Sequence, residues 1–182
     1  INDYPGAYNG LQVANSGDVT SIACAVDASL PVIRDAVAKN ASLLIVHHGL
    51  FWQGVQKLTG PVYEKFRLAI ENNLAIYSSH LPLDIHPTLG NNSLLADGIG
   101  LKNCEEFGDF KGNPMGIKGS YPLTLAELLD QLESLLGCRP HHCPGRGNDV
   151  GTLGIITGGA GSEVAQMASH GINTFLTGEG PH

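Results

Sequence analysis

Residues 20–48 decide the fold, and they read TSIACAVDASLPVIRDAVAKNASLLIVHH. The run 20–26 is short and apolar, with polar residues on both sides, and this pattern predicts a buried strand. Ser29 can cap a helix in which Pro31 suits the first turn, and apolar residues then recur at helical spacing. Residues 43–46 form a second apolar run. A strand, a helix and another strand in this order favour a parallel β-α-β unit.

The same alternation continues toward residue 101. The pattern predicts a helix over 61–72, a strand over 74–77 and a helix that begins at Asn91 or Asn92. A repeated β-α-β-α-β-α order is typical of a parallel sheet with helices on both faces. We therefore expect an N-terminal α/β lobe over residues 1–101.

The second half repeats this logic more weakly. Residues 102–122 are rich in Gly and Pro and mark the junction between lobes. A leucine-rich helix follows, capped by Thr124 and ended by Gly137. Further expected elements are strands over 139–143, 152–157 and 174–176, and a helix over 162–170. We expect a second α/β lobe over 102–182, incomplete at its C-terminus, and mostly parallel sheets in both lobes.

Composition excludes several functional classes. The 182 residues carry 10 Lys and Arg against 17 Asp and Glu, a formal net charge of −7, which disfavours a general nucleic-acid binder. No apolar run approaches the length of a membrane span. The four cysteines form no CxxC pair, so they indicate a reducing, cytoplasmic setting in which Cys24 is a buried thiol.

Four candidate ligands follow two of the predicted strands. His47 and His48 come directly after the strand 43–46, and His80 and Asp84 follow the next strand. Ligand sites of open parallel sheets form outside the carboxyl ends of the strands. Imidazole and carboxylate groups bind Zn, Fe, Mn or Ni, so a metal site is one interpretation, and polar loop residues without a ligand are the other.

The geometry of these segments leaves two arrangements open. Adjacent histidines on a straight strand point to opposite faces, so they converge only if the backbone turns at Gly49, or else each serves a different ion. Pro82 is expected to exclude a regular helix over 80–84 and to leave a stiff loop. His86 is a weaker candidate for the same site.

Two further polar segments are weaker signals. His141 and His142 form another pair, which we interpret as a surface feature because no strand-end partner accompanies it. The glycine-rich segment 158–162 joins a strand to a helix, where it either binds an anion or simply makes a tight turn.

An ordered set of short segments resembles one family. The segments are YNGLQV at 8–13, HHGLFW at 47–52, HLPLDIHP at 80–87, TGG at 157–159 and LTGE at 176–179. Together they resemble the NIF-three-like family, also labelled GTP cyclohydrolase I type 2 homologues, in its short bacterial form. The resemblance implies two α/β lobes with a dinuclear metal cleft between them and a homohexameric ring.

The resemblance also implies roles for individual residues. His47, His48 and Asp84 would be ligands of two divalent metal ions, Zn, Fe, Mn or Ni, and His80 would be a catalytic proton shuttle or a further ligand. The family's C-terminal Gly-His-x-x-x-Glu segment does not occur here, and His182 is not assigned as a ligand.

A dinuclear centre of this kind suits hydrolysis. The predicted function is a metal-dependent hydrolase acting on a small molecule such as a nucleotide, another phosphoester or a cyclic amide, in the manner of a GTP cyclohydrolase. The alternative is a non-catalytic metal-binding protein or a ring-forming interaction scaffold. In each case the resemblance implies a homo-oligomer.

Overall fold

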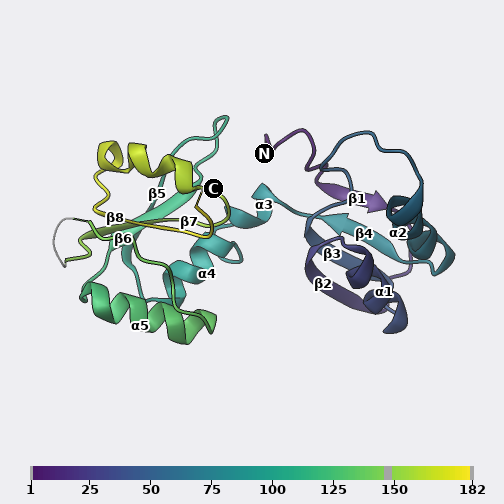
Figure 1. Cartoon of the computed structure of the whole chain (residues 1–182), viewed down its shortest axis with the longest axis horizontal. Helices are drawn as coiled ribbons and strands as arrows, with labels where there is room; N and C mark the ends of the chain where they lie inside the picture. Colours follow the sequence, from purple (N-terminus) through teal and green to yellow (C-terminus); the bar gives the residue numbers. More distant parts are fainter. Residues whose placement is uncertain (1, 146–148, 181–182) are drawn as a thin grey trace. The chain divides into compact units, whose positions relative to one another are not determined.

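The computed structural model describes residues 2–145 and 149–180. The chain folds into two compact units, Ile1–Leu83 and Asp84–His182 (Figure 1). Each unit contains a four-stranded mixed sheet with helices, which confirms the expected α/β class with two sheets. No helix within the described ranges is long and apolar enough to cross a membrane.

The first sheet contains the strands that the sequence predicts. Its four strands, in the spatial order β1-β4-β3-β2, are β1 (Gly10–Val13), β4 (Ala75–Ser78), β3 (Leu43–His48) and β2 (Ile22–Asp27). Strands β2, β3 and β4 are parallel, and β1 pairs with β4 in the antiparallel sense. The carboxyl ends of β2, β3 and β4 therefore lie at one edge.

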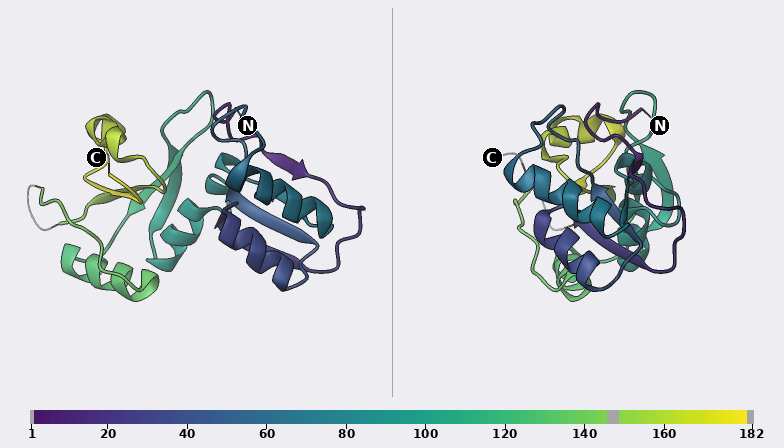
Figure 2. Two further views of the ribbon diagram at one scale, coloured as in Figure 1. Left: turned by 45° about the vertical axis from the view of Figure 1, so that its right-hand side comes forward. Right: turned by 90° about the vertical axis from the view of Figure 1, so that its right-hand side faces the viewer.

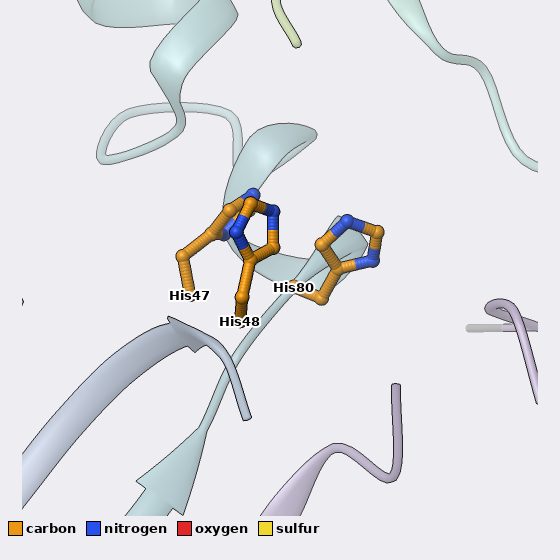
Figure 3. A group of neighbouring side chains, drawn as sticks. All are labelled: His47, His48 and His80. Carbon is orange, nitrogen blue, oxygen red and sulfur yellow. The ribbon is translucent and has the colours of Figure 1, made fainter. Parts of the chain in front are cut away.

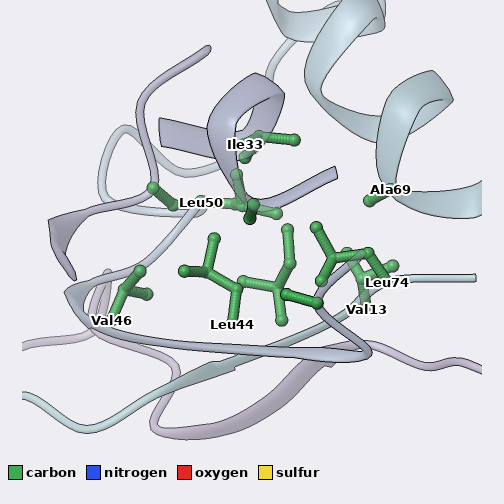
Figure 4. Packing of buried hydrophobic residues seen from close by; sticks show 11 residues of the cluster. Val13, Ile33, Leu44, Val46, Leu50, Ala69 and Leu74 are labelled. Atoms are coloured by element: carbon green, nitrogen blue, oxygen red, sulfur yellow. The ribbon is translucent and has the colours of Figure 1, made fainter. Parts of the chain in front are cut away.

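Two helices cover one face of this sheet. Helices α1 (Leu30–Ala38) and α2 (Gly60–Glu71) pack against each other and lie on the same side of the strands (Figure 2). Leu44 and Ile33 are fully buried between the helices and the sheet (Figure 4). Ile76, which is also fully buried, belongs to the same cluster. Burying three such side chains contributes roughly 1.5–3 kcal/mol each.

The expectation of helices on both faces is wrong for this unit. Ala23 and Ala25 of β2 pack against the core, whereas the side chains of Ile22, Cys24 and Val26 point to the opposite face of the sheet and are exposed. Cys24 is therefore an exposed thiol and not the buried one expected from its apolar neighbours. An apolar run does not by itself show whether one face or both faces of a strand are covered.

The segment after β4 also differs from the expected loop. Residues Leu81–Asp84 form a single helical turn, α3. Pro82 lies in the first turn of this helix, where its missing N–H would have had no helical partner in any case. The proline is thus compatible with one turn, although it would not be compatible with the interior of a longer helix.

The second unit has a different strand pattern. Its sheet has the order β5-β6-β7-β8, with β5 (Lys102–Phe107), β6 (Gly116–Ser120), β7 (Thr152–Ile156) and β8 (Thr174–Thr177). Only β7 and β8 are parallel, because β5–β6 and β6–β7 are antiparallel pairs. The expectation of a mostly parallel second sheet is therefore wrong.

The helices of the second unit are α4 (Asn91–Gly98), α5 (Leu125–Leu136) and the 3₁₀ helix η1 (Gly161–His170). Helix α5 has the predicted ends: Thr124 forms a capping box with Glu127, and Gly137 adopts the left-handed conformation, φ 73°. The strand expected over 139–143 is absent from the structure, where these residues are mostly exposed coil.

Helix α4 packs in the second unit. Ala96, Ile99 and Leu101 belong to the same buried cluster as Leu128 and Leu153. The regular alternation of strands and helices groups α4 with the first sheet, and this is the basis of the expected boundary at residue 101. The structure places the boundary between Leu83 and Asp84.

Candidate metal centre

Three histidines meet at the carboxyl edge of the first sheet. Strand β3 ends at His47 and His48, and His80 lies just beyond the end of β4, beside β3. One ring nitrogen from each histidine lies within 4.8 Å of the other two. The rings project to the same side of the strand ends (Figure 3), with centroids 4.7 Å apart for His47–His48 and for His47–His80. The three rings therefore converge, although His47 and His48 are neighbours on one strand.

Each ring has an oxygen partner at Nδ1. His47 Nδ1 lies 3.1 Å from the carbonyl oxygen of Ser79, and His48 Nδ1 lies 2.8 Å from Asp27 Oδ1. His80 Nδ1 lies 2.9 Å from Asp3 Oδ1. Carbonyl and carboxylate oxygens only accept hydrogen bonds, so each Nδ1 donates its N–H. In a neutral ring the acceptor lone pair is then on Nε2, which is the arrangement of metal-ligating histidines.

The donor set therefore fits a divalent first-row metal. Three neutral imidazoles suit Zn, Fe, Ni or Cu better than Mg or Ca, which prefer oxygen ligands. The hydrogen bonds at Nδ1 orient the rings before any ion is present. A group of three histidines with this support is a stronger indication than the spacing of the sequence motif alone.

Asp3 is the most enclosed acidic partner in this group. Its side chain is 6% exposed, whereas the side chain of Asp27 is 63% exposed. Burial alone would raise the pKa of Asp3, but the hydrogen bonds from Asn9, His80 and the Tyr4 N–H outweigh it and lower the pKa below its ordinary value. Asp3 is consequently a carboxylate at neutral pH.

Gln12 and Gly49 fix the loop that follows the histidine pair. The side-chain oxygen of Gln12 accepts the N–H of Leu50 at 2.6 Å, and its amide donates to the carbonyl of Tyr8 at 3.0 Å. A Cβ at position 49 would overlap the Gln12 amide. Any side chain at position 49 would have to displace the hydrogen-bonded Gln12 amide, which gives a physical reason for glycine in HHGL and for glutamine in YNGLQV.

Aromatic side chains surround His80. The Trp52 ring lies edge-on to His80 with centroids 4.6 Å apart, and it lies 5.6 Å from the His48 ring. The Tyr4 ring is 6.0 Å from His80. In the part of the chain that the structure describes, the Trp52 indole Nε1 is buried without a hydrogen-bond partner. Trp52 therefore gives His80 and His48 an aromatic neighbour on one side of the group.

The family model for Duf34/NIF3 (NGG1p interacting factor 3) matches residues 5–182. The chain belongs to the DUF34/NIF3 family. It is 38% identical over 187 residues to a Deinococcus radiodurans protein named "GTP cyclohydrolase 1 type 2 homolog", covering all of this chain and 70% of that protein. The resemblance seen in the sequence is thereby confirmed.

Two solved structures of this fold are similar to the DUF34/NIF3 chain described here. The structure titled "protein ybgI, unknown function" has a TM-score of 0.86 and 34% identity, and the match covers all of this chain and 72% of that one. The protein TTHA1606 from Thermus thermophilus has a TM-score of 0.83 and 31% identity, and the match covers 97% of this chain and 70% of that one.

Asp84 and the three histidines fall in different units of the chain. It is the first residue of the second unit, and its side chain accepts the Asn91 amide N–H at 2.7 Å. Asp84 is 8% exposed. The group of three potential ligands consists of His47, His48 and His80. The role of Asp84 as a ligand stays a prediction.

The other sequence candidates have structural explanations. His86 Nδ1 accepts the N–H of Leu89 at 3.1 Å and so closes a turn. His141 and His142 are exposed, as expected of a surface pair. Gly158 has a left-handed φ of 74° at a bend between β7 and η1, consistent with the tight-turn interpretation. His182 lies outside the described residues.

Sequence reasoning missed the two acidic partners of the histidines. Asp27 could have been found from the sequence, because it directly follows the predicted strand 20–26, and in the sheet it pairs with His48. Nothing in the sequence pattern points to Asp3, since it lies 77 positions from His80 and outside every predicted element.

Proposed function

We propose that this chain is a divalent-metal-dependent hydrolase that acts on a small molecule. The observation that supports this most strongly is the convergence of three imidazoles, each with its Nδ1 engaged by an oxygen. Neutral imidazoles attract one another only weakly, so the cluster by itself adds little to the stability of the fold. Binding a ligand through the ring nitrogens is therefore the better explanation of this arrangement. The proposal includes two ions per chain, as in the dinuclear centre that the resemblance implies.

The chain's own residues would divide the work as follows. His47 and His48 would hold the ions, and Asp84, in the same HLPLD segment as His80, would supply the further carboxylate that the resemblance implies. Bound divalent ions supply Lewis acidity and lower the pKa of a water molecule. His80 would offer its Nε2 lone pair either to an ion, as a further ligand, or to a proton that it holds or moves during hydrolysis.

The proposed substrate class is a nucleotide or cyclic amide. The relative from Deinococcus radiodurans is named "GTP cyclohydrolase 1 type 2 homolog", and this name is one support for the choice. The aromatic rings of Trp52 and Tyr4 beside His80 are the other support, because they offer apolar faces to a planar ring.

A turnover assay tests this function. Metal-supplied protein is incubated with a panel of GTP, other nucleotides, phosphoesters and cyclic amides, and product formation is followed with and without chelator. We expect chelator-sensitive hydrolysis of a panel member, lost in Asp84→Ala and retained in Asp97→Ala, a change at an exposed carboxylate. Metal binding without turnover across the panel would overturn the hydrolase assignment in favour of a metal-binding scaffold.

A further inference from the structure

The N-terminal segment holds His80 at its ring and its backbone simultaneously. The ring Nδ1 lies 2.9 and 3.1 Å from the two carboxylate oxygens of Asp3. The backbone N–H of His80 donates to Asn9 Oδ1 at 2.7 Å. The same Asp3 carboxylate accepts the N–H of Leu81 at 3.0 Å and the amide of Asn9 at 2.7 Å. His80 is therefore fixed by contacts that involve no ligand.

We propose that Asp3 is a positioning residue, which holds His80 as the Nδ1–H tautomer and leaves its Nε2 lone pair for the ligand. The reason is the chemistry of the pair: a carboxylate has no proton to donate, so the ring must supply it. In water a neutral histidine also populates the Nε2–H tautomer. The buried Asp3 carboxylate favours the Nδ1–H tautomer, because only that tautomer donates a hydrogen bond to it. The identity of the ligand as a divalent ion rests on the proposed function.

The burial of Asp3 distinguishes it from the other carboxylate at the site. The His48–Asp27 pair has a similar contact of 2.8 Å, but its side chains are 40% and 63% exposed. The His80–Asp3 side chains are 10% and 6% exposed. Water can replace the Asp27 oxygen, whereas the Asp3 oxygen has no such substitute at hand. Asp27→Asn is thus a matched control for Asp3→Asn.

The first experiment reads the tautomer directly. Long-range ¹H–¹⁵N correlation spectra of the metal-free protein, recorded over a series of alkaline pH values, report which nitrogen of a neutral ring carries the proton. The His80→Gln variant identifies the His80 signals. We expect Nδ1–H for His80 in the unaltered protein and a shift toward Nε2–H in Asp3→Asn, with the His80 tautomer unchanged in Asp27→Asn.

The second experiment measures the affinity for Zn²⁺ alone by competition with a coloured chelator. We expect Asp3→Asn to weaken binding by about 10- to 100-fold, as for other partners of metal-ligating histidines, and Asp27→Asn to weaken it less. Circular dichroism checks that each variant is folded.

Three results would overturn the proposal: an Nε2–H tautomer of His80 in the unaltered protein, a tautomer that does not respond to Asp3→Asn, or an unchanged Zn²⁺ affinity in that variant. The first requires no substitution, so it decides the matter even if Asp3→Asn does not fold. Since the tautomer is read without metal or substrate, its outcome is independent of whether the hydrolase assignment holds.

Discussion

The carboxylate of Asp3 lies 2.9 Å from Nδ1 of His80, although the two residues are separated by most of the first unit in sequence. The contact joins the N-terminal segment to the loop that follows β4. A segment with no regular secondary structure therefore orients a ring at the sheet edge. This explains why residues before the first strand matter for a site formed at the ends of later strands.

The first prediction concerns the close approach at Gly49. Gly49→Ala places a methyl group against the Gln12 amide and separates Gln12 from Leu50, so we expect a loss of about 1–3 kcal/mol in the free energy of unfolding. Urea denaturation measures it. The matched control is Gly159→Ala, where a Cβ would meet no atom within 4 Å. Equal stability of the two variants would show that the Gln12 contact has no energetic role.

The core of the first unit gives a second prediction. Leu44 is fully buried between the sheet and the helices, so Leu44→Ala is expected to cost about 2–5 kcal/mol in unfolding free energy. Leu58→Ala is the control, because Leu58 is 59% exposed and such surface changes stay within about 0.5 kcal/mol. A Leu44→Ala loss no larger than that of Leu58→Ala would contradict the packing described for this core.

A third prediction uses the capping box of α5. Hydrogen bonds from the side chain and backbone N–H of Thr124 lower the pKa of Glu127 below its ordinary value of 4.5. A carboxylate with a lowered folded-state pKa stabilises the fold above the unfolded-state pKa, and this contribution is lost as the pH falls through the folded-state value. Glu127→Gln should therefore be less stable than the unaltered protein at neutral pH.

The lowered pKa of Glu127 also predicts how the stability difference between the unaltered protein and Glu127→Gln changes with pH. The stability gap between the two proteins should close as the pH falls below 4.5. Thermal unfolding at neutral and acidic pH measures both values, with Glu163→Gln in η1 as a control for the loss of one negative charge from a first helical turn. A gap that widens on acidification would show that the cap does not act through the carboxylate.

A fourth prediction concerns Asp84. If it is a metal ligand, Asp84→Asn should lower metal-dependent hydrolysis and the bound metal content while the fold is retained, because the amide keeps the size of the side chain but not its charge. Metal content after gel filtration and a far-ultraviolet dichroism spectrum check both parts. Asp109→Asn is a control at another aspartate of the same unit. Full metal content in Asp84→Asn would exclude it as a ligand.

Local signals in the sequence predict much of this fold. The apolar runs 20–26 and 43–46, the cap at Ser29 and the leucine stripe after Thr124 correspond to observed elements. Strand direction in the second sheet is not predictable in this way, because the antiparallel β6–β7 pair is joined across a long connection that contains α5. Exposure of Cys24 likewise depends on which face of the sheet the helices cover.

Local sequence patterns likewise predict only some residues of the candidate site. His47, His48 and His80 are recognisable because they follow strands whose ends meet at one edge, a rule that needs only local patterns. The contribution of Asp3 depends on the path of a segment without regular structure, and no periodicity reports that path. Contacts between residues distant in sequence are therefore the part of the site that the sequence pattern leaves out.

The central claim is that His47 and His48 bind metal, and metal content tests it most directly. The proteins are loaded with Zn²⁺, desalted and analysed by plasma mass spectrometry, beside the control His141→Ala/His142→Ala, which removes an exposed histidine pair. We predict about two ions per chain in the unaltered protein and the control, and a loss of bound zinc in His47→Ala/His48→Ala. Equal zinc content in the two double variants would contradict the claim.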